Sequence, residues 1–297
     1  MEKSRNGTQK CVAAIIVTYN RLNLLKRCVS GLRNQSYKDF DIIVVNNGSS
    51  DGTEEWLRKQ TDIIAISQSN SGGAGGFYSG MKKAYDDGYE WIWLMDDDGL
   101  AENNQLRNLL NGALSLNSLF VNALVCNIES TECLSFGLIY SRRLTYLVKD
   151  VVNVSSIPDS INPFNGTLIN RKVVSKVGLI KKEMFIWGDE KEYTFRAQRA
   201  GFGVYTITNA IHYHPRSKGD KKNIIPFYKK YQFVVPSIER QKIKFRNDGF
   251  IYTKYSTFGG RAKYLIKYSL YFILRFDYIG LFRLFKYYHM GAKNHFT

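Results

Sequence analysis

Three consecutive carboxylates, Asp96, Asp97 and Asp98, end the aromatic and apolar run "YEWIWLM". Adjacent like charges repel one another and are difficult to desolvate at the end of a buried strand, so they need compensating partners. The hard cations Mg²⁺ and Mn²⁺ prefer carboxylate oxygens and leave coordination positions open for diphosphate oxygens. The first and third residues of such a run can face the same ion. The alternative is a solvated acidic loop that caps the following helix.

Two further segments carry residues suited to the same chemistry. The segment "FIWGDEKEYTFRAQRAGF" places Asp189, Glu190 and Glu192 directly after an aromatic run. A carboxylate there could act as a general base, or the three could form an ordinary acidic helix start. The segment "AIHYHP" presents His212 and His214, either of which could complete a metal site. A lone histidine is usually structural, so the hypothesis depends on the combination.

The segment "NSGGAGGF" contains four glycines and is expected to be a loop before a helix at 78–86. Glycine permits close backbone approach and positive φ, which suits a loop beside a phosphate or a sugar, although such segments are often simple turns. No Gly-Lys-Ser/Thr follows, so it is not a P-loop. It comes after the third predicted strand and not the first, so it is not a dinucleotide fingerprint either.

Strands that alternate with helices must position these residues. The run "VAAIIVTY" is typical of a parallel strand buried on both faces, and further strands are expected at 40–45, 63–66 and 91–95. An apolar stripe after residue 22 and a segment at 53–60 predict helices. This order indicates a mostly parallel sheet, in which ligands bind beyond the carboxyl ends of the strands. The loops at 20, 46–51, 69–76 and 96–98 all come after strands and should gather at one edge.

Composition indicates a packed globular protein, because 44% of the 297 residues are hydrophobic and 14% are aromatic. The four cysteines show no C-x-x-C spacing, so neither a zinc site nor a disulfide framework is indicated, and a reduced cytosolic compartment fits. The N-terminal apolar run lacks the pattern of a signal peptide. No apolar run approaches the roughly 20 residues that span a bilayer.

The net charge of +16 is concentrated in the tail. Residues 215–297 contain 18 Lys and Arg but 4 Asp and Glu, whereas the rest of the chain is nearly neutral. This asymmetry indicates an anionic partner. The mixture of aromatic, aliphatic and basic residues favours helices that lie on an anionic membrane surface, and no motif accompanies the charge to suggest nucleic acid. The alternative is that the tail packs on the rest of the chain or forms a homo-oligomer interface.

The ordered motifs "VTYNR", "VVNNGSSDGT", "NSGGAGGF", "WIWLMDDD", "FNGTLINR", "GDEKEYTFRAQRAGF" and "IHYHP" together resemble family 2 glycosyltransferases with the GT-A fold. The similarity is greatest to the branch of bacterial galactofuranosyltransferases and their rhamnosyltransferase relatives. It covers residues 11–215 and implies an α/β catalytic domain at 1–215, with a nucleotide-binding half at about 11–100 and an acceptor-binding half at about 119–215. A basic, aromatic, helical tail would occupy 216–297, either membrane-associating or oligomerising.

The resemblance also implies roles for single residues. Asp96, Asp98 and His214 match the metal ligands, for Mn²⁺ or Mg²⁺, with His212 the weaker histidine candidate. Asp189 matches the catalytic base, with Glu190 as the alternative. The implied substrate-binding residues are Thr18, Tyr19, Arg21, Asn46, Asp51, Asn70, Gly72, Gly73, Asp97 and Trp187.

Three of these assignments carry alternatives. Many family members have an aspartate that contacts the nucleotide base where this chain has Asn46, which leaves the identity of the base open. Asp97 contacts the donor sugar or orients the loop. Trp187 stacks on the acceptor sugar or is a core aromatic residue.

The implied reaction is inverting transfer of galactofuranose from UDP-galactofuranose, or of rhamnose from dTDP-rhamnose, to a hydroxyl group. The acceptor would be a glycan or a lipid-linked glycan of a bacterial surface polysaccharide, such as O antigen or capsule. The enzyme is expected in the cytoplasm, peripheral on the inner face of the cell membrane. The competing hypothesis is a non-catalytic protein that keeps the fold to bind a sugar nucleotide or a glycan.

Overall fold

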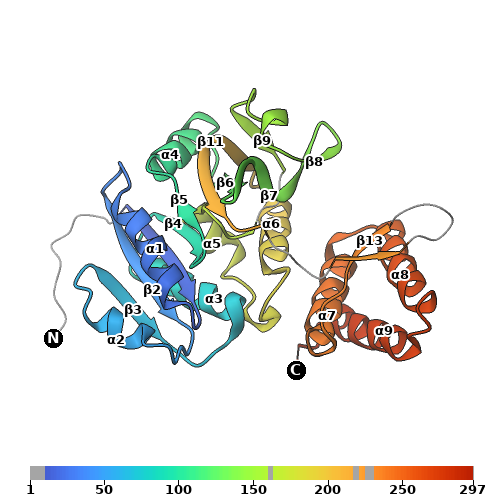
Figure 1. The fold of residues 1–297 in the computed structure, drawn as a ribbon. Coiled ribbons are helices and arrows are strands. Elements are labelled where there is room, and N and C mark those ends of the chain that lie inside the picture. The colour runs from blue at the N-terminus through green and yellow to red at the C-terminus, as the bar shows by residue number, and fades with distance from the viewer. Residues whose placement is uncertain (1–10, 160–162, 217–220, 225–230, 297) are drawn as a thin grey trace. The chain divides into compact units, whose positions relative to one another are not determined.

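The structure, a computed structural model, describes residues 11–159, 163–216, 221–224 and 231–296. Its contacts divide the chain into two compact units. The first contains Met1–Lys182 and Tyr193–Arg216, and the second contains Glu183–Glu192 and Ser217–Thr297. Figure 1 shows that strands with flanking helices make up the first unit, while helices dominate the second.

A mixed sheet forms the centre of the first unit. Its strands are β1 (Val12–Thr18), β2 (Phe40–Asn46), β3 (Ile63–Ser67), β4 (Trp91–Asp96), β5 (Leu100–Ala101), β6 (Phe120–Asn127), β7 (Ser130–Tyr140), β8 (Arg143–Leu147), β9 (Ser156–Pro158), β10 (Thr167–Asn170) and β11 (Val204–His214). The order is β3-β2-β1-β4-β10-β6-β11-β5, with β7 beside β6, β8 beside β7 and β9 beside β11. The predicted α/β class is confirmed.

The helices of this unit are α1 (Leu22–Arg33), α2 (Thr53–Arg58), α3 (Gly72–Asp86), α4 (Gln105–Ser115), α5 (Arg171–Val177) and the larger part of α6 (Asp189–Arg199). Two 3-10 turns, η1 (Val148–Asp150) and η2 (Lys182–Met184), complete the elements up to residue 216.

The first four strands run parallel, as the sequence predicts. β1 pairs in parallel with β2 and β4, and β2 pairs in parallel with β3. Thr18 lies opposite Asn46, and Val17 lies opposite Asp96. The carboxyl ends of these strands therefore meet at one edge, where the polar loops gather.

Strand β1 is buried on both faces. Ile15 and Val17 face α3, which packs on one side of the sheet. The alternate residues face α1 in a cluster that includes Val12, Ala14, Ile16, Leu25, Cys28, Val29 and Leu32. This alternation explains why the run is apolar without interruption.

The glycine-rich segment is the start of α3 and not a loop, so that prediction is wrong. A Cβ atom at Gly76 would lie 2.4 Å from Val17 Cγ1, and one at Gly80 would lie 2.4 Å from Ile15 Cγ2. Contacts this short do not occur, so these glycines let α3 approach β1 closely. At Gly73, by contrast, a Cβ atom would meet nothing within 4 Å.

The second half of the sheet brings β11 to the carboxylate edge. β10 lies antiparallel to both β4 and β6, while β11 is parallel to β6. The short strand β5, which begins two residues after Asp98, pairs with the end of β11, so that Ala101 lies opposite His212. His214, two residues further along β11, is thereby brought beside the turn that carries Asp98.

The second unit contains α7 (Ile238–Tyr255), α8 (Phe258–Ile273) and α9 (Tyr278–Ala292), with a hairpin of β12 (Lys221–Ile224) and β13 (Tyr231–Val234). Side chains of Thr257 and Asp277 accept hydrogen bonds at the starts of α8 and α9. Its core is largely aromatic: Phe233, Val235, Phe245, Tyr264, Tyr268, Tyr271, Phe272, Leu284 and Tyr288. Among the described residues, no helix has the length and apolar character needed to cross a membrane.

Candidate metal and nucleotide-sugar site

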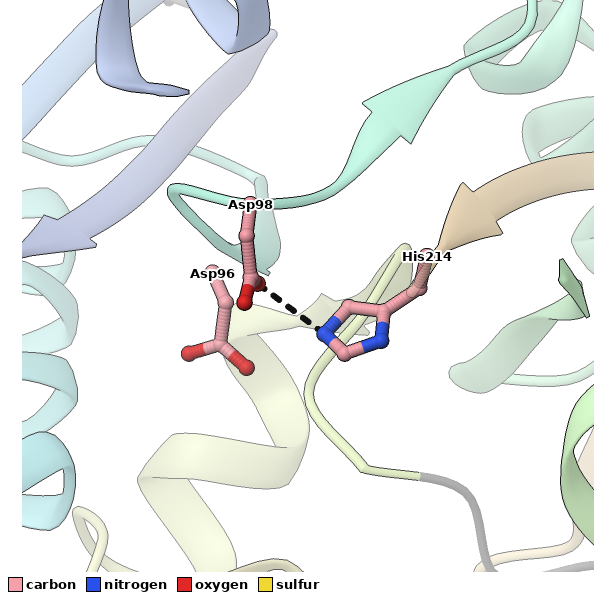
Figure 2. Close-up of side chains that lie close together, drawn as sticks. All are labelled: Asp96, Asp98 and His214. Carbon is pink, nitrogen blue, oxygen red and sulfur yellow. Dashed lines mark ion pairs between the residues drawn. The ribbon is translucent and has the colours of Figure 1, made fainter. Parts of the chain in front are cut away.

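Asp96, Asp98 and His214 converge where β4 and β11 end (Figure 2). One ligand atom from each lies within 4.8 Å of the other two. Asp96 is the last residue of β4, Asp98 belongs to the following turn, and His214 is the last residue of β11. Two carboxylates and one imidazole at this spacing could hold a divalent cation.

The imidazole of His214 is held in one orientation. Its Nδ1 lies 2.6 Å from the carbonyl oxygen of Pro215, and its Nε2 lies 3.0 Å from Asp98 Oδ1. Because a carbonyl only accepts hydrogen bonds, Nδ1 carries the proton and Nε2 is directed toward the carboxylates. The ring also packs against Phe136 at a centroid distance of 5.2 Å. This is how a histidine ligand is usually prepared for a metal.

One carboxylate oxygen of Asp98 is available to bind a cation. Its Oδ2 accepts a hydrogen bond from Arg21 Nη1 at 2.9 Å. Its Oδ1 is buried and, apart from the ion pair with His214, has no hydrogen-bond partner in the part of the chain that the structure describes. A buried carboxylate oxygen whose one partner is a titratable imidazole is suited to a cation that the imidazole can also bind.

Asp96 lies in an environment that disfavours its charge. Burial, followed by the negative charge of Asp98, raises the pKa of Asp96 to about 7. The Asn165 amide donates to Asp96 Oδ2 at 3.1 Å and partly offsets that effect. Although burial opposes it, the Asp98 carboxylate raises the pKa of His214. Asp96 and His214 therefore retain their protons more readily than isolated groups would, whereas, although burial opposes it, His214 and then Arg21 lower the pKa of Asp98.

Asp97 is engaged with the end of β1. Its Oδ2 accepts from the Thr18 hydroxyl at 2.7 Å, and its Oδ1 accepts from Arg21 Nη1 at 3.2 Å. It is buried, and burial raises its pKa despite these two donors. Both oxygens thus tie the acidic turn to β1, and Arg21 bridges Asp97 and Asp98.

His212 lies inside the protein and is not part of the cluster of candidate ligands. Its Nδ1 pairs with Gln105 Oε1 at 3.1 Å, and its side chain is fully buried. Burial, together with the neighbouring His214, lowers the pKa of His212 to about 3. A neutral, enclosed imidazole of this kind has a structural role, which leaves His214 as the histidine of the cluster.

The loop after β2 is held by its own polar residues. Asn46 Nδ2 donates to Glu54 at 2.9 Å, and Asn46 Oδ1 accepts from the backbone N–H of Ser49 at 3.0 Å. Asp51 Oδ2 accepts from the N–H of Leu22, the first residue of α1, at 2.9 Å. Although burial opposes it, hydrogen bonds from Thr53 and then Leu22 lower the pKa of Asp51.

The same loop is joined to the start of α3. Asn70 Oδ1 accepts from the N–H of Gly72 at 3.0 Å and from Asn47 Nδ2 at 3.3 Å. Asn47 Nδ2 also donates to the Gly72 carbonyl at 2.9 Å. Asn70, Gly72 and Gly73 therefore lie beside the β2 loop, at the edge where Thr18 ends β1. Tyr19, directly after Thr18, is 46% exposed and available to a ligand.

Two residues of this region, Asn165 and Asn47, were not predicted from the sequence. Asn165 Oδ1 also accepts a hydrogen bond from the backbone N–H of Asp96, at 3.3 Å. Asn165 therefore binds both the backbone and the carboxylate of Asp96. Both asparagines lie inside the motifs "FNGTLINR" and "VVNNGSSDGT", and these motifs were the available signal.

The remaining predicted residues, Trp187, Asp189 and Glu190, lie in the segment that groups with the second unit. Asp189 is the first residue of α6 and is buried, with 7% of its surface exposed. Glu190 Oε2 accepts from the backbone N–H of Gly188 at 3.1 Å. Trp187 is 37% exposed, and the guanidinium of Arg240 lies 5.9 Å from its ring centroid.

Comparison with solved structures supports the fold. The structure resembles TarS from S. aureus (residues 1–349), with a TM-score of 0.51 at 15% sequence identity. That similarity covers 69% of this chain and 60% of the other, so less than two thirds of the TarS fragment is matched. A TarS structure in complex with UDP gives a TM-score of 0.52 at 12% identity over 86% of this chain and 78% of the other.

Comparison of sequences identifies the family. Residues 13–178 match Glycosyl transferase family 2. Galactofuranosyltransferase GlfT1 of Mycolicibacterium smegmatis is 30% identical over 96% of this chain and 97% of its own length. GlfT1 of Mycobacterium tuberculosis (strain ATCC 25618 / H37Rv) is 33% identical over 72% of this chain and 73% of its own. The chain is a glycosyltransferase and belongs to glycosyltransferase family 2, in its galactofuranosyltransferase-like branch.

Proposed function

We propose that the protein is an inverting, metal-dependent galactofuranosyltransferase. It moves galactofuranose from UDP-galactofuranose to a hydroxyl of a growing, lipid-linked bacterial surface polysaccharide. The observation that carries the proposal is the cluster of Asp96, Asp98 and His214, in a chain that matches GlfT1 over 96% of its length.

The donor set fits Mn²⁺ or Mg²⁺. Carboxylate oxygens suit both ions, and Asp98 Oδ1 with the aligned His214 Nε2 offers two directed ligands. Such a cation would neutralise negative charge on the leaving diphosphate. Arg21 contributes a fixed positive charge beside the same carboxylates and limits their mutual repulsion.

Asp189 is the proposed base. A base accepts the proton of the acceptor hydroxyl while that oxygen attacks the anomeric carbon and the nucleoside diphosphate leaves from the opposite face. Glu190 is the alternative base, and its carboxylate accepts the Gly188 N–H just before α6. A positioned base of this kind typically contributes about 10²–10⁴-fold to the rate.

The nucleotide is proposed to lie at the edge where β1 and β2 end and α3 begins. Exposed Tyr19 and the open first turn of α3 at Gly73 leave room there. Thr18, Asn46, Asp51 and Asn70 line the surrounding loops, and the contacts of Asp97 favour its loop-orienting role. Related TarS structures contain UDP and UDP-GlcNAc, which is consistent with a uridine nucleotide.

An anionic membrane surface is the proposed partner of the second unit. Helices α8 and α9, with the turn between them, expose large apolar side chains: Phe258, Ile266, Leu270, Ile273, Leu274, Phe276, Tyr278, Ile279, Phe282 and Phe285. Lys263, Lys267, Arg275 and Lys286 are exposed among them. Apolar side chains interspersed with cations suit the headgroup region of an anionic bilayer, where a lipid-linked acceptor resides.

A donor screen on the purified protein tests the proposal. Release of nucleoside diphosphate would be measured from UDP-galactofuranose and dTDP-rhamnose, each with Mn²⁺ and with EDTA, using short and lipid-linked glycan acceptors. The expected result is release from UDP-galactofuranose that EDTA abolishes. The second donor is included because Asn46 replaces the usual base-contacting aspartate. Release from dTDP-rhamnose alone, or full activity in EDTA, would overturn the donor or the metal assignment respectively.

A further inference from the structure

The loop at 185–188, directly before α6, has an unusual backbone. Phe185 and Trp187 have φ angles of 65° and 66°, and Gly188 has a φ of 93°. Bulky aromatic residues rarely adopt positive φ, because the Cβ atom then crowds the backbone. The N–H of Ile186 donates to the Met184 carbonyl at 2.7 Å and closes a tight turn around Phe185. A segment in this conformation persists only where surrounding contacts fix it.

The side chain of Asn247, in α7, supplies such contacts. Its Nδ2 lies 2.8 Å from the Met184 carbonyl, 3.0 Å from that of Ile186 and 2.8 Å from that of Trp187. Only 1% of Asn247 is exposed. One amide nitrogen has two hydrogens, so three converging carbonyls saturate it. Without this group, the part-buried carbonyls of Ile186 and Trp187 would lose this donor, and the positive φ angles of the loop would lose contacts that stabilise them.

Arg246 orients the Asn247 amide. The guanidinium Nε donates to Asn247 Oδ1 at 3.2 Å, which directs the oxygen toward Arg246 and the nitrogen toward the loop. The other guanidinium nitrogens donate to the Glu183 carbonyl at 3.1 Å and to the Phe296 carbonyl at 2.9 Å. The pair thus joins the loop, α7 and the C-terminal residues.

Two more residues on the same face of α7 extend the contact. Ile251 Cδ1 lies 2.8 Å from where a Cβ atom on Gly188 would be. The Tyr255 hydroxyl donates to Glu192 Oε1, in the first turn of α6, at 2.7 Å. Positions 247, 251 and 255 are spaced by four residues and form one stripe of the helix. That stripe runs alongside the chain from the loop into α6.

We propose that Asn247, oriented by Arg246, is a positioning residue that fixes the loop at 185–188 and thereby sets the side chain of Asp189 at the start of α6. The inference rests on the proposed role of Asp189 as the base. It gives the C-terminal helices a second role besides binding a surface, namely to hold the segment that carries the proposed base.

Kinetics of Asn247→Ala test the proposal, with the donor and acceptor that the screen identifies. A displacement of about 1 Å in a catalytic group can cost on the order of 10²-fold, so kcat should fall by roughly that factor. The KM for the donor and the Mn²⁺-dependent affinity for UDP should stay near wild type, because those sites lie in the first unit. Phe245→Leu is the matched control: it weakens the core of the second unit without touching the loop, and should lower the thermal midpoint but not kcat.

The double variant Asn247→Ala, Asp189→Asn separates positioning from general damage. If Asn247 acts through Asp189, the double variant should be no slower than Asp189→Asn alone. Losses that multiply, or an unchanged kcat in Asn247→Ala, would overturn the inference. Full activity of Asp189→Asn would instead overturn the base assignment, whatever Asn247 does.

Hydrogen exchange of residues 183–192 gives a readout that requires no substrate. These amides should exchange faster in Asn247→Ala and at the wild-type rate in Phe245→Leu. Should Asn247→Ala not fold, Tyr255→Phe removes the hydroxyl that binds Glu192 with almost no change in volume. It should accelerate exchange at the start of α6 and lower kcat. Wild-type exchange and kcat in the variant that folds would contradict the proposal.

Discussion

At the scale of single residues, the three adjacent carboxylates have three different environments. Asp97 is satisfied by Thr18 and Arg21, and Asp96 is held by Asn165. Asp98 shares Arg21 but directs its other oxygen toward His214. The run is tolerated because each carboxylate has its own partner. The partner of Asp98 Oδ1 is the imidazole of His214, and a cation could bind both groups.

The protonation of this cluster predicts how metal affinity depends on pH. The pKa of Asp96 is raised to about 7, and that of His214 is also raised. Both groups must lose their protons to bind a cation, so affinity for Mn²⁺ should fall as the pH falls from about 8 to about 6. The loss should be small above the pKa of each group and approach about tenfold per pH unit for each proton displaced below it. Calorimetry at both pH values, in buffers of different ionisation enthalpy, would count those protons.

Asp98→Asn is the matched variant for that measurement. This substitution keeps the size of the side chain but removes the Asp98 carboxylate, which is both the negative charge facing His214 and a proposed metal ligand. The affinity for Mn²⁺ should therefore drop at every pH. Wild-type affinity in Asp98→Asn, or binding of Mn²⁺ that is independent of pH, would show that the cation binds elsewhere.

The types of the cluster residues were predictable, but most of their partners were not. The D-x-D spacing and the "YHP" segment pointed to Asp96, Asp98 and His214, which the structure brings together. The sequence could not separate His212 from His214 by type alone, because the difference is which imidazole faces the two carboxylates. The role of Asn165 could not be predicted, because it depends on the pairing of β10 with β4, two strands that are far apart in the sequence.

At the scale of elements, the glycines of α3 set the distance between helix and sheet. Gly80→Ala should destabilise the first unit by about 1–3 kcal/mol, because the added methyl group would meet Ile15 Cγ2 at 2.4 Å. Gly73→Ala is its matched control in the same helix. That methyl group meets nothing within 4 Å, and alanine favours helix by about 0.5–1 kcal/mol. Unfolding by denaturant measures both, and equal stability of the two variants would contradict the packing argument.

The sequence predicted the first four strands and a strand at "LFVNALVC", which is β6, but not how the later strands join the sheet. Continuous apolar runs identify β1, β2 and β4, which are largely buried on both faces, and also the more exposed β3. Nothing local distinguishes the reversed direction of β10 or the pairing of the two-residue β5 with β11. The grouping of Glu183–Glu192 with the C-terminal helices has the same origin, because it depends on Asn247 and Arg246, which are distant in sequence.

At the scale of the whole molecule, charge and exposed apolar surface coincide in the C-terminal region. Residues 215–297 hold 18 of the 42 basic residues but 4 of the 26 acidic ones. The protein should therefore float with vesicles that contain phosphatidylglycerol and phosphatidylcholine, but not with pure phosphatidylcholine. High salt should weaken this binding, because a cationic surface is screened within about a Debye length.

The apolar part of that surface needs its own variant. Ile279→Ser with Phe282→Ser removes two α9 side chains that are each 65% exposed, and should reduce flotation without loss of folding. Ile139→Ser is the control, since Ile139 in β7 is similarly exposed at 67% but lies in the nearly neutral region. If the wild type binds no vesicles but forms dimers that the α9 variant dissociates, the surface is an interface between copies of the chain. Binding that survives the α9 substitutions but not high salt would assign the attachment to charge alone.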